Sequence, residues 1–131
     1  MIKLLLVDDD NDFLELLIAL INSAFKPRND LLIDLANSAA EALELIKENQ
    51  YDVIVSDYNL KSGKNGMDIL VEAREKSSAS LFMFTSDPRI RSIFDSRFNG
   101  SAFFFGKDKS LELVSQIHEM TGHPEYLRRS R

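Results

Sequence analysis

The sequence contains no cysteine, so the chain forms no disulfide and has neither a zinc–thiolate site nor a thiol nucleophile. Internal repeats and low-complexity segments are also missing. No apolar stretch is long enough to span a bilayer, and the opening Met1-Ile2-Lys3 leads to no small-residue cleavage site of a signal peptide. We therefore expect a cytoplasmic protein without a membrane segment.

An excess of positive charge is missing as well. The 16 basic residues are outnumbered by 21 acidic ones, which gives a formal net charge of −5 and argues against a general nucleic-acid binder. A length of 131 residues with 44 % apolar content suits one soluble globular domain. We place this domain at residues 1–121 and expect residues 122–131 to be a tail too short to fold alone.

Strand-like and helix-like segments alternate along the chain. Short apolar segments predict strands at residues 2–7, 31–35, 52–56, 80–84 and 102–105. Helical patterns follow each of them, at residues 11–25, from Ser38 onward, at 67–76, after Pro88 and at about 110–120. Ser38 and Glu41 have the spacing of a capping box. Such alternation predicts an α/β fold, with a parallel sheet covered by helices on both faces.

Helical periodicity gives the first helix two adjacent apolar stripes. The stripe expected to face the core consists of Phe13, Leu17, Leu20 and Ala24. The second stripe consists of Leu14, Ile18 and Phe25. If the second stripe is exposed, it is a candidate surface for a partner; otherwise a neighbouring helix or the following loop covers it.

Chemically active side chains stand where the predicted strands end. Asp8 and Asp9 follow the first strand and Asp57 follows the third, while Thr85 closes the fourth and Lys107 follows the fifth. In an open parallel sheet, the carboxyl ends of the strands form the edge where ligands bind. Three carboxylates, a hydroxyl and an ammonium gathered there suit a magnesium ion and a phosphoryl group.

These residues, in this order, resemble the response-regulator receiver domain (CheY-like), the phosphoryl-accepting module of two-component and phosphorelay signalling. The resemblance covers roughly residues 2–121 and extends to the loop that begins Asp57-Tyr58-Asn59-Leu60 and continues to Asn65-Gly66-Met67. It implies a flavodoxin-like, doubly wound (βα)5 fold with strand order 2-1-3-4-5.

The resemblance also implies roles for the strand-end residues. Asp57 would accept a phosphoryl group from a histidine kinase or a histidine phosphotransfer domain. Asp9, Asp57 and the backbone carbonyl of Asn59 would ligate Mg²⁺, and Asp8 would hold it through a coordinated water. Lys107 would pair with the phosphoryl oxygens.

Further residues would control the response. By resemblance, Thr85 would move to the phosphoryl group and Phe104 would be the switch aromatic, while Asn59 and Asp87 would tune hydrolysis of the acyl phosphate. The protein would signal by a phosphorylation-dependent change of conformation, as a monomer or a phosphorylation-dependent dimer, and would not be an enzyme beyond its own phosphotransfer and autodephosphorylation. Its downstream target or output domain is unknown.

Three positions depart from the family pattern. Lys61 and one additional residue stand in a loop that usually carries a proline, Ser86 replaces an alanine after Thr85, and Asp108 replaces a proline after Lys107.

Two other functions fit parts of the sequence. In a haloacid-dehalogenase-like phosphohydrolase, Asp8 would be the nucleophile with Thr85 and Lys107 as further motifs, but Asp57 would then have no role. In a pseudo-receiver, the fold would serve only for interaction, which leaves the complete acid set unexplained. Asp10 is expected to be an acid at a helix start, and His118 and His123 are expected at the surface without ligand spacing.

Overall fold

A computed structural model describes residues 2–25, 31–61 and 63–121 of the chain. The strands are β1 (Ile2–Val7), β2 (Leu31–Ala36), β3 (Val53–Ser56), β4 (Ser80–Thr85) and β5 (Phe103–Gly106). The α-helices are α1 (Asn11–Ala24), α2 (Ala39–Glu48), α3 (Gly66–Lys76), α4 (Arg91–Phe98) and α5 (Ser110–Thr121). Two 3₁₀ turns, η1 (Pro88–Ile90) and η2 (Lys107–Lys109), precede α4 and α5. All strand pairs are parallel, and their order is β2-β1-β3-β4-β5, as predicted.

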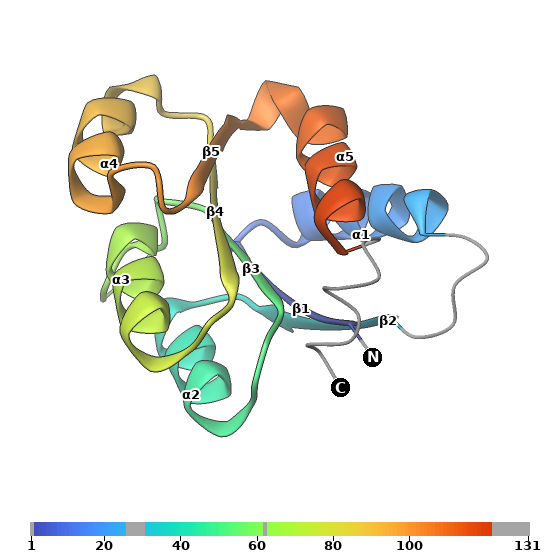
Figure 1. Cartoon of the computed structure of the whole chain (residues 1–131), viewed down its shortest axis with the longest axis horizontal. Coiled ribbons are helices and arrows are strands. Elements are labelled where there is room, and N and C mark those ends of the chain that lie inside the picture. Colours follow the sequence, from blue (N-terminus) through green and yellow to red (C-terminus); the bar gives the residue numbers. More distant parts are fainter. Residues whose placement is uncertain (1, 26–30, 62, 122–131) are drawn as a thin grey trace.

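Figure 1 shows α1 and α5 on one face of the sheet and α2, α3 and α4 on the other. An apolar cluster lies on each face. On one face, Leu4 and Leu6 of β1 pack with α1 and α5, and on the other, Leu5 and Val7 pack with the cluster formed by α2, α3 and α4. Because both faces of the sheet are covered, the strands need continuous apolar residues rather than an alternating pattern. The predicted doubly wound fold is confirmed for the described part of the chain.

The predicted core face of α1 was partly right. Of its four residues, Leu17 is buried, whereas Phe13, Leu20 and Ala24 are only partly buried against the core. The other buried residues of the helix are Leu14 and Ile21, which the prediction did not place there. The helix is apolar over much of its circumference, so periodicity alone could not choose between neighbouring faces; contact with α5 as well as the sheet decides.

The second apolar stripe of α1 is therefore not an exposed surface. Leu14 and Phe25 are buried, and Ile18 is partly buried against the core. The exposed large apolar residue of α1 is Leu16, which is 52 % accessible and belongs to neither predicted stripe.

Side-chain caps fix where the helices begin. Asp10 caps α1 by accepting hydrogen bonds from the amides of Asp12 and Phe13, which confirms it as a helix-start acid. Ser38 caps α2 by accepting from the amide of Glu41, but the Glu41 side chain accepts from the amide of Asn37, so the predicted box does not close.

A complete capping box begins α3 instead. The side chain of Asn65 accepts from the amide of Asp68, and the Asp68 carboxylate accepts from the amide of Asn65. This reciprocal pair fixes the start of α3 beside the loop that follows β3.

Within residues 2–25, 31–61 and 63–121, none of the helices has the length and apolar character needed to cross a membrane. His118 is exposed, as predicted, and its ring packs edge-on against Phe25 with centroids 5.1 Å apart. His123 and the predicted tail, residues 122–131, lie outside the described residues.

Candidate functional site

The strands β1 and β3 end in register at one edge of the sheet. Val7, the last residue of β1, pairs with Ser56, the last residue of β3. The residues that follow, Asp8 and Asp57, therefore leave the sheet side by side, and the amide of Asp57 donates to the carbonyl of Val7 over 2.9 Å. The sheet itself thus brings together two acids that are 49 positions apart in the sequence.

Three carboxylates form a cluster at this edge. Oxygens of Asp8, Asp9 and Asp57 all lie within 4.8 Å of one another. Asp8 and Asp57 are only 5 % and 7 % exposed, and Asp9 is half-buried. Hard carboxylate oxygens at this spacing fit a divalent cation such as Mg²⁺, which takes one or two carboxylates and keeps several waters. The predicted acid set is therefore brought together.

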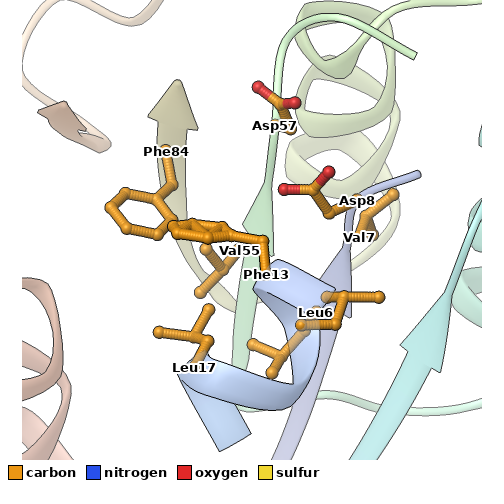
Figure 2. A pocket seen from close by; sticks show the side chains of 9 residues that line it. Leu6, Val7, Asp8, Phe13, Leu17, Val55, Asp57 and Phe84 are labelled. Carbon is orange, nitrogen blue, oxygen red and sulfur yellow. The ribbon is translucent and has the colours of Figure 1, made fainter. Parts of the chain in front are cut away.

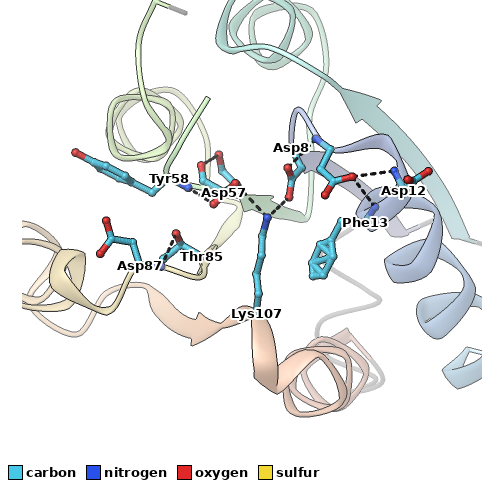
Figure 3. A network of polar contacts seen from close by, with 10 residues as sticks. Asp8, Asp12, Phe13, Asp57, Tyr58, Thr85, Asp87 and Lys107 are labelled. Carbon is cyan, nitrogen blue, oxygen red and sulfur yellow. Dashed lines mark hydrogen bonds and ion pairs between the residues drawn. The ribbon is translucent and has the colours of Figure 1, made fainter. Parts of the chain in front are cut away.

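Lys107 bridges two of these acids (Figure 3). Its Nζ lies 2.7 Å from Oδ2 of Asp8 and donates to Oδ2 of Asp57 over 3.1 Å. Burial opposes the lysine charge, but the hydrogen bond to Asp8 and the charges of both acids raise the pKa of Lys107 above its usual value. Burial also raises the pKa of Asp8, although Lys107 and the amide of Asp10 hydrogen-bond to its carboxylate. The lysine is the positive charge within this acidic cluster.

Hydrogen bonds within the loop after β3 fix the position of the Asp57 side chain. Oδ1 of Asp57 accepts from the backbone amide of Tyr58 over 2.8 Å, and the carbonyl of Tyr58 accepts from the amide of Gly66 over 2.9 Å. A Cβ on Gly66 would lie 1.9 Å from the carbonyl oxygen of Asp57, so only glycine fits. The sequence indicated Gly66 by resemblance alone, whereas the structure gives the physical reason.

Thr85 is the last residue of β4, which pairs with β3, the strand that Asp57 follows. It is buried, and its Oγ1 accepts from the amide of Asp87 over 3.3 Å. It lines a pocket of about 350 Å³ together with Ser86, Pro88, Phe104, Gly106, Lys107 and Asp108. The pocket thus brings the predicted switch residues Thr85 and Phe104 into one place.

Phe104 is held from the side of α4. Its ring centroid lies 5.3 Å from that of Phe94, and the guanidinium of Arg91 lies 5.0 Å from the Phe104 ring centroid. The ring is partly buried, so the observed position is stabilised by aromatic and cation–π contacts.

The two predicted tuning residues differ in their surroundings. Asn59 is exposed in the loop after Asp57. Asp87 is bound by Arg89, whose Nε and Nη2 donate to its two carboxylate oxygens over 2.9 and 3.0 Å. These hydrogen bonds hold the pKa of Asp87 below its usual value. The sequence did not indicate that Arg89 would occupy this carboxylate.

One residue at the site was assigned only to the core. The Phe13 ring centroid lies 4.5 Å from Nζ of Lys107 and stacks on Phe84 at 5.3 Å. Beneath the carboxylates of Asp8 and Asp57 there is a small, largely apolar cavity that Phe13 lines (Figure 2). The sequence feature that could have indicated this role is the position of Phe13 in the first turn of the helix that follows Asp8 and Asp9.

The family model for the response regulator receiver domain matches residues 4–118. The chain belongs to this family. Receiver domains are phosphoacceptors of two-component signalling, phosphorylated by histidine kinases or phosphotransfer proteins, and are not generally classed as enzymes. The predicted recognition and function are thereby confirmed at the level of the family.

Solved structures agree with this receiver-domain fold. The response regulator TrrA from Thermotoga maritima, in complex with Mg²⁺ and BeF, is 25 % identical over 91 % of this chain and 98 % of its own, with a TM-score of 0.75. A two-component response regulator from Clostridium difficile is 24 % identical over 100 % and 99 %, with a TM-score of 0.75. A CheY-like receiver from Methanospirillum hungatei JF-1 is 20 % identical over 98 % of each chain, with a TM-score of 0.78.

No curated protein matches this sequence with significant similarity. The haloacid-dehalogenase-like alternative, with Asp8 as nucleophile, finds no support among the proteins that match. In the structure, Asp57 belongs to the same cluster as Asp8 and Asp9, whereas that alternative gave it no role.

Proposed function

We propose that Asp57 is the phosphoryl acceptor of this receiver domain. The observation that carries this proposal is a nearly buried carboxylate that has two further acids within 4.8 Å and a lysine ammonium at 3.1 Å. An oxygen of Asp57 would attack the phosphorus of a phosphohistidine and form an acyl phosphate. The N–P bond breaks, and the imidazole nitrogen leaves with the bonding electron pair. Such a transfer needs chiefly positioning and stabilisation of charge.

The acid cluster fits Mg²⁺. Asp9, Asp57 and the carbonyl of Asn59 would hold the ion directly, and Asp8 would hold it through a water. When bound, the ion neutralises charge on the acids and on the phosphoryl oxygens. Support comes from the donor set of this chain and from the Mg²⁺–BeF complex of TrrA, a relative of 25 % identity.

Lys107 would change partners during the reaction. It now pairs with Asp8 and Asp57, at 2.7 and 3.1 Å. Once Asp57 carries a phosphoryl group, the phosphoryl oxygens would become the partners of the Lys107 ammonium, which acts as a point charge. The hydroxyl of Thr85 would then donate a hydrogen bond to the phosphoryl group, and Phe104 would move toward the space that Thr85 leaves.

The donor would be a histidine kinase or a phosphotransfer protein, and the receiver would act in the cytoplasm as a monomer or a phosphorylation-dependent dimer. Residues 1–121 would form the receiver domain, and residues 122–131 a tail.

Labelling with acetyl phosphate tests the acceptor. We expect intact mass spectrometry to find one phosphoryl group on the wild type only when Mg²⁺ is present, and none on Asp57→Asn. Asp12→Asn is the matched control, because Asp12 is an exposed acid in the first turn of α1, outside the cluster. Equal labelling of Asp57→Asn would reject the assignment, and label lost only in Asp8→Asn would favour the phosphohydrolase alternative.

We further propose that Asp87 orients the water that hydrolyses the acyl phosphate, and that Arg89 restrains it. Both oxygens of Asp87 are hydrogen-bonded to Arg89, so the guanidinium competes with water for this carboxylate. In a phosphate-release assay, Asp87→Ala should lose its label several-fold more slowly than the wild type, and Arg89→Ala should lose it faster. If both variants decay at the wild-type rate, neither residue controls hydrolysis.

A further inference from the structure

Lys107 has a third contact at the site besides its two carboxylates. Its ammonium nitrogen lies 4.5 Å from the centroid of the Phe13 ring. A cation within about 6 Å of an aromatic ring centroid is attracted by the negative face of the ring. Figure 3 shows the Phe13 ring beside the lysine, on the side of α1.

The ring that receives the ammonium is itself held on two sides. It stacks on Phe84 with 5.3 Å between centroids and 25° between planes. The backbone amide of Phe13 donates to the Asp10 side chain that caps α1. Phe84 is the residue of β4 directly before Thr85. Figure 2 shows the two rings close together below the acids. The aromatic pair beside Lys107, Phe13 and Phe84, therefore joins α1 to the sheet.

Phe13 differs from the other two partners in what happens to it during phosphorylation. Asp8 and Asp57 would both exchange Lys107 for other partners when metal and phosphoryl group arrive. The ring binds neither of these and carries no charge, so its attraction for the ammonium persists. A lysine side chain is long and flexible and loses much rotamer freedom when it is held in one place. A contact that is kept throughout the reaction reduces that loss during the transfer itself.

We propose that Phe13 is a positioning residue that holds the ammonium of Lys107 at the acceptor during phosphoryl transfer. The inference rests on the proposed role of Asp57. A purely structural role for Phe13 would be to fill space above the small cavity that it lines with Leu17, Val55 and Phe84. The two roles differ in one respect: packing depends on ring volume, whereas attraction for a cation depends on the ring electrons.

Fluorinated phenylalanines at position 13 separate these roles. Successive fluorines draw electron density from the ring face and change its volume little. We expect the rate of labelling by acetyl phosphate at saturating Mg²⁺ to fall stepwise along the series, by roughly three- to tenfold in total, with an unchanged melting temperature. The same series at Phe103, which stacks on Phe82 at 4.7 Å, is the control and should leave the rate unchanged.

Ordinary substitutions give a second measurement. Phe13→Tyr keeps a ring face and should label at nearly the wild-type rate, whereas Phe13→Leu should be several-fold slower. In a Lys107→Met background, Phe13→Leu should cause no further loss, because Phe13 acts through the lysine. An equal loss in both backgrounds, or a flat fluorine series, would overturn the proposal. If Phe13→Leu does not fold, the fluorine series decides alone.

Nuclear magnetic resonance of the unphosphorylated protein provides a readout that needs no phosphorylation. The Hε protons of Lys107 should be shifted upfield by the Phe13 ring current, and should return toward the ordinary lysine position in Phe13→Leu. An unshifted Lys107 in the wild type would exclude the contact. Failure of wild-type labelling on Asp57 with a shifted Lys107 would instead reject the proposed function and leave the contact standing.

Discussion

Three acids and one lysine set the charge balance at the residue scale. Asp8 is 5 % exposed and Asp57 is 7 % exposed, so water stabilises their charges poorly and the ammonium of Lys107 must do so. A bound cation would supply the same compensation. The stability of the protein and the occupancy of the proposed metal site should therefore depend on each other.

Replacing the lysine tests this dependence. We expect Lys107→Met to lower the free energy of unfolding by about 1–3 kcal/mol without metal, because Asp8 loses its closest cation and remains buried. Mg²⁺ should raise the free energy of unfolding of the variant by more than it raises that of the wild type. Urea titrations with and without Mg²⁺ measure both terms.

Lys109→Met is the control for that experiment. Lys109 pairs with Glu112 at 3.7 Å, and both side chains are more than half exposed, so its loss should change stability by less than about 0.5 kcal/mol. A loss in Lys107→Met that metal does not reduce would show that the lysine acts through packing rather than charge.

Gly66 offers a second test at this scale. Gly66→Ala places a methyl group against the backbone of Asp57, at 1.9 Å before any adjustment. We expect a loss of about 2–4 kcal/mol of stability, and slower labelling on Asp57, because the acceptor strand end must shift. Urea denaturation and acetyl phosphate labelling measure the two effects.

Gly100 provides the comparison for Gly66. It has a positive φ of 83° and open space around a would-be Cβ, so Gly100→Ala should cost only about 1 kcal/mol of backbone strain and leave labelling unchanged. If the two variants behave alike, the close approach of Gly66 to Asp57 is not what requires glycine.

At the scale of elements, a hydrogen bond ties the edge strand β2 to the start of β3. The hydroxyl of Tyr51 donates to Oδ2 of Asp34 over 2.6 Å. Burial, together with this hydrogen bond and the carboxylate charge, raises the pKa of Tyr51 above its usual value of 10.0. The folded state thus holds the phenolic proton more tightly than the unfolded chain does.

The contribution of Tyr51 to stability is complete below pH 10.0, the usual pKa of tyrosine, and is lost as the pH rises above it. We expect Tyr51→Phe to cost about 0.5–1.5 kcal/mol at neutral pH. In strongly alkaline solution the difference should shrink, since only the wild type loses this contribution. Urea midpoints of both proteins over an alkaline pH series check it, and parallel curves would contradict it.

The elements also separate what the sequence could predict from what it could not. Five apolar runs bounded by polar residues predicted five strands, whose observed ends differ from the predictions by at most one residue. The core face of α1 was predicted correctly only at Leu17. Leu14 and Ile21 were missed because they share the helix with other apolar residues, and only contact with α5 and the sheet selects among them.

The site shows the same division. Acids at strand ends are readable, since parallel strands share an edge, and this predicted the cluster that Asp8, Asp9 and Asp57 form. The ring of Phe13 under Lys107 and the clamp of Arg89 on Asp87 were not predicted. The first joins residues 94 positions apart, and the second depends on the turn that η1 makes.

For the whole molecule, the question is how a change at Asp57 would reach a distant face. The pocket between Thr85 and Phe104, of about 350 Å³, offers room for the aromatic ring to move. Phe104 has no hydroxyl, so packing alone would separate its two positions. In the observed position it packs on Phe94 of α4, so motion of the ring would change its contact with α4.

Hydrogen exchange with beryllofluoride and Mg²⁺, which mimic an acyl phosphate, tests this coupling. We expect protection to change across residues 85–107, including the segment that carries Ile90, Ile93 and Phe94. Asp57→Asn should show no such change and is the control. Changes confined to the neighbourhoods of Asp8 and Asp57 would mean that the signal leaves through another surface.

Tyr58 gives the receiver an optical reporter of its own. The chain has no tryptophan and three tyrosines, so no indole masks or drains tyrosine emission. The amide of Tyr58 donates to Asp57, and its phenol oxygen accepts from the Asn65 side chain that caps α3. The backbone of Tyr58 is thus hydrogen-bonded to Asp57, and its phenol to the residue that caps α3. Binding of a cation or a phosphoryl group should therefore alter the ultraviolet emission of the unlabelled protein, so that these events can be followed in real time.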